Sequence, residues 1–480
     1  MEWFAASNAR AYSLFLRVKM DTIALKLLSL TLFGVVIMSV LDPNEDTFVF
    51  PAEVPPAIRD ESKVPPYVLP DPLLSLNGEE VETVEQWEKK RRPELLELFK
   101  EHVYGKVPMQ KMHQSNLATK SEIADKDENA LGGKATRLQM EITLTKDDPN
   151  WRATDKRGQM INVLIYIPNR INGEIPEPGT IPAFISYNFN GNHTICDDPG
   201  IDLPLVWIKK EKEFLRIQAE ESTRGESASR WPVERIIDSG FALITAYYGD
   251  VSPDFVGGRK EGVQGVFDKG DQTESVGNDW GAIAAWAWGL SMISSLAALE
   301  DDAETINWKQ VAVVGHSRLG KTALWAGATD QRFAIVISND SGCGGAALSR
   351  REFGETIFRM NSVFPHWLCG NCKKYNENIN ECPVDQHELI ALIAPRPVYV
   401  ASATEDLWAD PKGEFLSCLH ADPVYKLLGT EGLGDCTEMP GPDTPVGKTI
   451  QYHNRTGKHD ITEYDWIQYI RFAKERFEGQ

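Results

Sequence analysis

Long apolar runs are nearly absent from this sequence, and the single one lies close to its start. Leu27–Val40 is shorter than the ~20 residues that a membrane-spanning helix needs. Basic residues precede this run and acidic residues follow it, which is the charge pattern of a signal peptide. We therefore predict export, with residues 1–41 as a signal peptide or an uncleaved N-terminal anchor, and with Met20 as an alternative start.

Clustered positive charge is also scarce. The 480 residues carry a formal net charge of −20, and the nearest approach to a basic cluster, Lys89–Arg92, lies among glutamates. An acidic protein is repelled by the phosphate backbone of nucleic acids. The composition therefore argues against a nucleic-acid partner and gives no sign of membrane contact beyond the N-terminal segment.

Cysteine is rare, and its count is odd. Seven cysteines leave at least one thiol without an intramolecular partner, even in an exported protein where disulfides form. Cys369 and Cys372 have the spacing of a redox or zinc motif. A redox motif needs a thioredoxin-like setting, and a zinc site of this kind needs a second such pair, which is missing. We predict no metal site and no cofactor.

Internal repeats and low-complexity tracts are absent as well, which favours one large domain. A hydrophobic content of 42% is ample for a buried core at this length. Residues 42–76 are rich in proline and acidic side chains, and we predict that they form an extended arm over the domain or a linker. Residues 77–480 are predicted to form the folded catalytic domain.

Strand-like runs alternate with helical stretches through this domain. Several runs are continuously apolar, as in strands that are covered on both faces. Such alternation predicts an α/β fold with a mostly parallel central sheet and helices on both faces. The runs are Thr136–Leu144, Ile161–Pro168, Ile181–Tyr187, Phe241–Tyr247, Val311–Gly315, Phe333–Ser338, Val398–Ala403 and Thr449–His453.

Helices and long insertions fill the intervals between these runs. The clearest predicted helices are Thr83–Tyr104, with a break or second start at Pro93, and Trp280–Leu299. Residues 190–235 and 345–385 are long insertions at strand ends. Because α/β folds build their sites at strand ends, these insertions are predicted to border the active site.

The most informative stretch of the chain is 310–325. A short β-branched run leads into Gly315–Ser317 and then directly into helix-forming residues. A strand, a sharp turn and a helix with serine at the apex form a nucleophile elbow, which exposes the hydroxyl. The match is imperfect, because Leu319 stands where the general pattern has glycine and Gly320 follows it. The alternative is a serine that only caps the helix.

A serine nucleophile needs a base, and the base is usually a histidine oriented by a carboxylate. In α/β-hydrolases the chain order is serine, acid, histidine. His459 lies on the loop between the last predicted strand and the final predicted helix, Thr462–Phe477, where this fold needs its base. Two aspartates follow strand ends. At such positions aspartate is also common simply as a turn residue or a helix cap. Asp406 is favoured because it occupies the usual acid position, and Asp340 is the alternative.

These segments together resemble the glucuronoyl esterases, carbohydrate esterase family fifteen, and more closely their bacterial members. The resemblance runs from about residue 70 to 475 and implies an α/β-hydrolase fold. The stretch 317–321 carries the family pattern Ser-Arg-x-Gly-Lys, which accounts for the displaced glycine. Further matching motifs are Asn339–Ala346, Phe353–Glu355, Phe364–Trp367, Asp385–Leu389 and Glu405–Pro411.

The resemblance implies catalytic roles residue by residue. Ser317 would be the nucleophile and His459 the base. Arg318 would help to stabilise the oxyanion, because its guanidinium is permanently charged and offers forked donors. Members of the family place the acid at one or both of two positions, which match Asp340 and Asp406. The first position is often glutamate, so the shorter aspartate at 340 favours Asp406.

The resemblance also implies a substrate, namely esters that join 4-O-methyl-glucuronic acid on xylan to lignin alcohols. Such an ester masks the carboxylate, so recognition must use the ring hydroxyls. Lys321, Glu355 and Trp408 would form this sugar pocket. The partners would be glucuronoxylan and lignin–carbohydrate esters, and the protein is expected to act as a monomer. The alternatives are an acetyl xylan esterase or general carboxylesterase of the same fold, and an inactive carbohydrate-binding relative.

Overall fold

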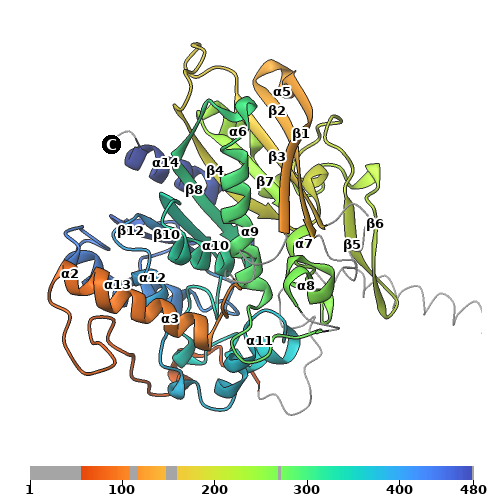
Figure 1. Cartoon of the computed structure of the whole chain (residues 1–480). Helices are drawn as coiled ribbons and strands as arrows, with labels where there is room; N and C mark the ends of the chain where they lie inside the picture. The colour runs from red at the N-terminus through yellow and green to blue at the C-terminus, as the bar shows by residue number, and fades with distance from the viewer. Residues whose placement is uncertain (1–55, 109–116, 147–158, 269–271, 478–480) are drawn as a thin grey trace, which may run out of the picture. The chain divides into compact units, whose positions relative to one another are not determined.

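A computed structural model of the chain describes residues 56–108, 117–146, 159–268 and 272–477 (Figure 1). The predicted leader, including the apolar run Leu27–Val40, lies outside these residues. Within the described ranges, no helix combines the length and the apolar character that crossing a membrane requires.

A mixed sheet forms the centre of the folded part. Its strands are β1 (Leu117–Asn129), β2 (Ala135–Lys146), β3 (Gln159–Pro168), β4 (Ile181–Asn188), β7 (Ala242–Tyr247), β8 (Ile306–His316), β9 (Ile335–Asn339), β10 (Val398–Ala403), β11 (Val446–Gly447) and β12 (Ile450–Arg455). They lie in the order β1-β2-β3-β7-β4-β8-β9-β10-β12-β11. Neighbours from β7 to β12 are parallel, and the remaining pairs at both ends are antiparallel. This sheet confirms the predicted α/β-hydrolase fold class.

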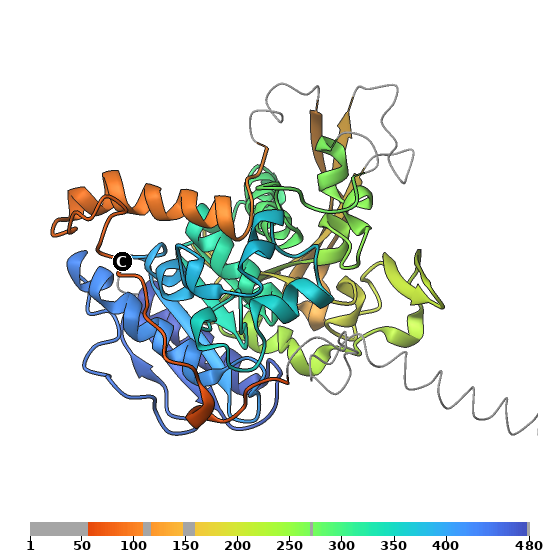
Figure 2. The same cartoon turned by 90° about the horizontal axis from the view of Figure 1, so that it is seen from below.

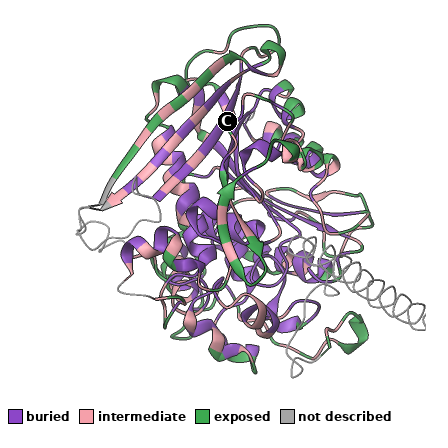
Figure 3. Cartoon of the chain, turned by 90° about the vertical axis from the view of Figure 1, so that its right-hand side faces the viewer, coloured by how far each residue is buried: buried purple, intermediate pink, exposed green. Residues whose placement is uncertain are grey.

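Helices cover both faces of the sheet. One face packs against α3 (Arg92–His102), α9 (Ala282–Ala297), α10 (Arg318–Thr329), α12 (Gln386–Ala391) and α13 (Pro411–Leu427), and the other against α6 (Val233–Asp238) and α14 (Glu463–Phe477). Along β8 the side chains alternate between the two cores, with Val313 in the first and Val314 in the second. Because both faces are covered, the central strands are largely apolar, and Figure 3 shows them buried.

Short elements complete the fold. The remaining helices and strands are α2 (Val84–Gln86), the π-helical η4 (Trp87–Arg91), α5 (Ala130–Gly133), β5 (Leu205–Lys210), β6 (Glu213–Gln218), α7 (Tyr248–Val251), α8 (Val263–Phe267) and α11 (Ile357–Val363). Single 3₁₀ turns lie at Glu61–Lys63, Asn192–Thr194, Glu221–Thr223, Ala228–Arg230, Gly258–Glu261, Asp301–Ala303, Ser349–Arg351, Gly370–Tyr375 and Ile379–Glu381. The hairpin β5–β6 belongs to the first predicted insertion and projects beside the antiparallel end of the sheet (Figure 2).

The N-terminal helical stretch has the predicted extent but no break. α2, η4 and α3 follow one another without interruption, and Thr83 forms a capping box at the start. Pro93 lies in the first turn of α3, directly after the π-helical turn η4, so the helical hydrogen bonding changes next to the proline while the stretch continues. Trp87 and Phe99 are fully buried, and Phe99 packs against Trp325 of α10.

The described part of the proline-rich arm, residues 56–76, contacts the folded domain at several points. Ile58 forms a β-bridge with Phe353, and the carbonyl of Pro70 lies 2.8 Å from Nε2 of His387. The Glu61 carboxylate pairs with Arg351 at 2.6 Å. These contacts hold this part of the arm along the domain surface.

Candidate active site

Ser317 stands between the last residue of β8 and the first residue of α10. Its φ of 57° with ψ of −128° is a conformation that an L-residue adopts only at an energetic cost. Its N–H donates to the carbonyl of Asn339 at 2.9 Å. The hydroxyl makes no capping hydrogen bond to α10, and Ser317 is partly exposed between buried neighbours. Ser317 therefore has the strained backbone expected at the apex of an elbow, and it lacks the side-chain hydrogen bond that a helix-capping serine would make.

Two glycines allow the chain to turn this sharply. A Cβ on Gly315 would lie 1.9 Å from the carbonyl oxygen of Leu319, and a Cβ on Gly320 would lie 2.9 Å from the Cβ of Ser341. Neither contact is sterically acceptable. Gly320 thus gives the helix its close approach to the neighbouring loop, while Leu319 is buried in the core. The displaced glycine is therefore a structural requirement of this elbow.

His459 lies on the loop between β12 and α14, beside the nucleophile turn. Its ring is 4.6 Å from that of His316, the residue before Ser317. Its Nδ1 is 2.5 Å from Oδ2 of Asp406, and both side chains are almost wholly buried. Its Nε2 is buried and has no hydrogen-bond partner among the described residues. A histidine held at Nδ1 by a carboxylate presents Nε2 as the free base.

The pairing of β10 with β12 brings this acid and base together. The two strands are parallel, with Ala403 opposite Arg455, so the loops that follow them leave the same edge of the sheet. The Glu405 N–H donates to the carbonyl of Gly457 at 2.8 Å and ties the two loops to each other. The position of Asp406 is therefore fixed by the backbone of the histidine loop itself.

Asp340 also lies near His459 but makes no direct hydrogen bond to it. Its Oδ2 accepts the N–H of Asp460 at 3.2 Å, and its Oδ1 is buried without a partner among the described residues. Burial, followed by the negative charges of Asp406 and neighbouring carboxylates, raises the pKa of Asp340 well above its usual range. Asp340 therefore holds its proton to a higher pH than an ordinary aspartate does.

Within the described ranges, Asp340, Asp406 and His459 form a cluster whose side chains are close enough together to be considered as metal ligands. One atom each from Asp340, Asp406 and His459 lie within 4.8 Å of one another. Two of these residues, His459 and Asp406, are hydrogen-bonded to each other.

Glu414 on α13 supports the loop that carries Asp340, and the sequence analysis missed it. Its Oε1 accepts the N–H groups of Ser341 and Gly342, each at 2.9 Å. Its Oε2 accepts the hydroxyl of Ser402 at 2.6 Å. Burial raises the pKa of Glu414 to about 8. Nothing in the local sequence marks Glu414, because its partners come from strands far away in the chain.

Arg318, the predicted oxyanion residue, is held by a residue that the sequence analysis also missed. Its Nη1 donates to Oδ2 of Asp254, on the loop after α7. The guanidinium lies 4.8 Å from the ring centroid of Trp367 and 5.4 Å from that of Phe364, which stack on each other. Both rings belong to the second predicted insertion, which therefore reaches the nucleophile turn.

The three predicted sugar-pocket residues are brought together by the structure. Lys321 Nζ donates to Glu355 Oε2 at 3.0 Å and to the carbonyls of Ser341 and Cys343 at 2.8 and 2.6 Å. The Glu355 N–H donates to the carbonyl of Trp408 at 2.9 Å. All three donors of the Lys321 ammonium are thus engaged, and this fixes the Glu355 carboxylate in place.

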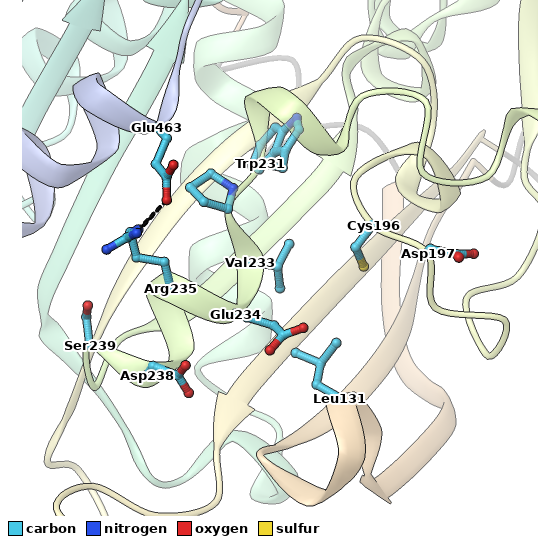
Figure 4. A pocket seen from close by; sticks show the side chains of 11 residues that line it. Leu131, Cys196, Asp197, Trp231, Val233, Glu234, Arg235, Asp238, Ser239 and Glu463 are labelled. Carbon is cyan, nitrogen blue, oxygen red and sulfur yellow. Dashed lines mark hydrogen bonds and ion pairs between the residues drawn. The ribbon is translucent and has the colours of Figure 1, made fainter.

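The thiols form no disulfides, and one hollow of the surface lies away from this constellation. All seven cysteines fall in the described ranges and none forms a disulfide there. A hollow of about 620 Å³ lies against α6 and the start of α14 (Figure 4), where Arg235 pairs with Glu463 at 2.8 Å. Its lining includes Trp231 and Cys196 but none of the predicted site residues. It is therefore a separate feature of the surface.

Comparison with known proteins gives consistent matches. The profile of the family described as "Glucuronyl esterase, fungi" matches residues 275–429. The carbohydrate esterase MZ0003 of an unknown prokaryotic organism is 46% identical over 423 residues, which is 88% of this chain and 92% of that protein. These matches extend well beyond the motif around Ser317.

Two solved structures are similar over comparable lengths. A promiscuous CE15 esterase from a marine bacterial metagenome is 45% identical with a TM-score of 0.76, covering 88% of this chain and all 100% of that one. A glucuronoyl esterase from Solibacter usitatus is 43% identical with a TM-score of 0.76, covering 86% of this chain and 99% of that one. The similarity therefore covers most of the described fold.

Proposed function

The chain belongs to the glucuronoyl esterases, carbohydrate esterase family fifteen, and we propose that it hydrolyses 4-O-methyl-glucuronate esters through an acyl-enzyme on Ser317. The enzyme is a carboxylic ester hydrolase. The observation that carries the mechanism is the His459–Asp406 pair, joined at 2.5 Å beside the strained serine turn.

The geometry supports a defined sequence of proton transfers. Ser317 Oγ attacks the ester carbonyl and gives its proton to His459 Nε2, while Asp406 stabilises the imidazolium through Nδ1. Arg318 stabilises the oxyanion of the tetrahedral intermediate. The alcohol leaves with the proton from His459, and water then attacks the Ser317 ester in the same way. The uronate is released as a carboxylate, and the serine recovers its proton.

Recognition of the acid portion is assigned to Lys321, Glu355 and Trp408. The masked carboxylate of the ester leaves hydroxyl groups as the polar handles of the sugar. A glutamate fixed by a buried lysine accepts hydrogen bonds from hydroxyls, and a tryptophan offers the apolar surface on which sugar rings pack. The released uronate would also be attracted by the positive charges of Arg318 and Lys321.

The natural setting of the reaction is part of the same proposal. The apolar run behind a basic leader supports export, and the charge of −20 disfavours nucleic acids. We therefore place the enzyme outside the cytoplasm as a monomer, acting on esters between glucuronoxylan and lignin alcohols.

Substrate preference tests this function directly. We expect kcat/KM on methyl and benzyl glucuronates to exceed that on acetylated xylan and aryl acetates, because only the uronate engages the sugar pocket. The measurement compares initial rates on the paired esters with one enzyme preparation. A preference for acetate esters by about tenfold or more, equivalent to about 1.4 kcal/mol of transition-state binding, would identify an acetyl esterase of the same fold instead.

Glu355→Ala should weaken catalysis on glucuronate esters about tenfold to hundredfold, and much less on aryl acetates. The loss of a buried hydrogen-bond partner costs about 1–3 kcal/mol, and only the uronate uses this partner. Rates on both ester types provide the measurement. Glu352→Ala is the matched control, because Glu352 is exposed in the same segment.

Two further observations decide how the Glu355 result is interpreted. Removing Glu355 leaves the buried Lys321 ammonium with one donor unpaired, so the thermal stability of the variant must be measured alongside. Glu355→Gln keeps the size of the side chain and should retain more activity than alanine. Equal losses on glucuronates and acetates would show that Glu355 has only a structural role.

A further inference from the structure

The carboxylate of Asp254 joins three segments that are distant in the sequence. Tyr248 OH donates to Oδ2 at 3.0 Å, and Arg318 Nη1 donates to the same oxygen. Trp367 Nε1 donates to Oδ1 at 2.6 Å, and Nε2 of His366 lies 2.8 Å from that oxygen. Two partners on each oxygen occupy the four acceptor sites of a carboxylate. Asp254 is therefore locked in one orientation.

Asp254 and Arg318 form a buried ion pair. Their side chains are only 5% and 10% exposed. Burial alone would raise the pKa of Asp254, but the Arg318 charge and the hydrogen bonds from His366 and Trp367 hold that pKa below its usual range. The aspartate is thus ionised and compensates the guanidinium charge. A buried cation without such a partner would be strongly destabilising.

The guanidinium is fixed on one side only. Nη1 is held by Asp254, and the planar group lies over the ring of Trp367. Nε has no hydrogen-bond partner among the described residues, and none of the described hydrogen bonds uses Nη2. A second carboxylate, Glu355, acts electrostatically on Arg318 but is already bound by Lys321.

We propose that Asp254 is a positioning residue that holds one side of the Arg318 guanidinium and so orients the other side toward the oxyanion. The inference rests on the oxyanion role of Arg318 given under Proposed function. A donor that is oriented before the reaction stabilises the developing charge without reorganising in the transition state. Without Asp254, the guanidinium would no longer be held in this orientation toward the oxyanion.

A double-mutant cycle tests the proposal on methyl glucuronate. Asp254→Asn keeps the side-chain shape but removes the charge, and it should lower kcat about tenfold to hundredfold, an effect of the size of losing an oxyanion donor. KM should change within about twofold, because the contact matters in the transition state. In an Arg318→Ala background, Asp254→Asn should cause no further loss of kcat, because Asp254 acts through Arg318.

The chain offers a matched control in a second buried pair. Asp198 bonds Arg137 at 2.9 Å and accepts the hydroxyl of Tyr166 at 2.5 Å, so it has the same kinds of partner. Asp198→Asn should lower the melting temperature but leave kcat unchanged. A loss of kcat in Asp198→Asn equal to that in Asp254→Asn would show a general effect of destabilisation and overturn the proposal.

The cycle separates the failure of this proposal from that of the oxyanion role. If Asp254→Asn keeps the wild-type kcat, or if its loss of kcat multiplies with that of Arg318→Ala, the positioning role alone is overturned. Wild-type kcat in Arg318→Ala overturns the oxyanion role and the positioning role with it. If Asp254→Asn does not fold, Arg318→Lys replaces it. A lysine ammonium lacks the fork that binds Asp254 and the oxyanion together, so kcat should fall about tenfold or more, and wild-type kcat overturns the proposal.

Discussion

Ser317→Ala is expected to lower kcat on benzyl glucuronate by about 10⁵- to 10⁶-fold while the protein stays folded. The hydroxyl is the proposed nucleophile, and no other described group stands at the apex of the strained turn. The change removes one oxygen that makes no capping hydrogen bond, so the fold should tolerate it. Turnover and circular dichroism of the purified variant provide the measurement.

A matched serine and a covalent probe complete this test. Ser362→Ala makes the same change on α11, where the hydroxyl only donates to the carbonyl of Phe358, and it should keep full activity. A serine-directed phosphonate should label the wild type and not Ser317→Ala. Substantial turnover by Ser317→Ala would show that the acyl-enzyme mechanism is wrong, and absence of wild-type labelling together with absence of turnover would indicate an inactive carbohydrate-binding relative.

Asp406→Ala should lower kcat by about 10³- to 10⁴-fold, and Asp340→Ala far less. Loss of the carboxylate that orients the histidine costs up to about 10⁴-fold in serine hydrolases. Asp406 bonds Nδ1 of His459 directly, whereas Asp340 bonds a neighbouring backbone N–H and has a raised pKa. Each variant serves as the control for the other, because both aspartates are buried and follow neighbouring strands.

The kinetics of the two single variants and the double variant decide the assignment. The reverse order of rates would identify Asp340 as the acid. If each single variant retains substantial activity and the double variant loses it, the two carboxylates share the role. Thermal stability must accompany these rates, because the Asp340 side chain also accepts the N–H of Asp460 on the histidine loop.

The pH dependence of stability gives a second readout for Asp340. Its pKa is raised in the folded state above the ordinary value of 3.8, so the folded protein binds this proton more tightly than the unfolded chain does. Stability is therefore lost as the pH rises from that value through the raised pKa. Asp340→Asn removes this titration and should flatten the dependence of the unfolding free energy on pH above the ordinary aspartate pKa of 3.8.

The sequence by itself determined the parts of this protein that depend on local pattern. The apolar run Val398–Ala403 is β10 with the same bounds, and the stretch around Ser317 forms the predicted strand, turn and helix. A strand that is buried on both faces is mostly apolar, and a sharp turn needs glycine beside it. Such requirements involve only a few neighbouring residues, so the pattern of residue types in the sequence is enough to predict these elements.

Elements with one exposed face left a weaker signal. β1 and the hairpin β5–β6 were not predicted, because these strands carry many charged residues and exposed or half-exposed positions. β1 is an edge strand whose exposed positions need no apolar side chain. Its place in the sheet depends on pairing with β2, which the sequence of β1 alone does not show.

Only the tertiary structure decided which groups meet at the site. Asp340 and Asp406 both follow strand ends. Asp406 is the one that bonds Nδ1 of His459, because of the order of the strands in the sheet and because a backbone hydrogen bond joins the Asp406 and His459 loops. Asp254 and Glu414 carry no local mark, because a turn aspartate and a helical glutamate are common anywhere. Their functions come from partners that lie far away in the chain, and such contacts are fixed by the packing of strands and helices rather than by neighbouring residues.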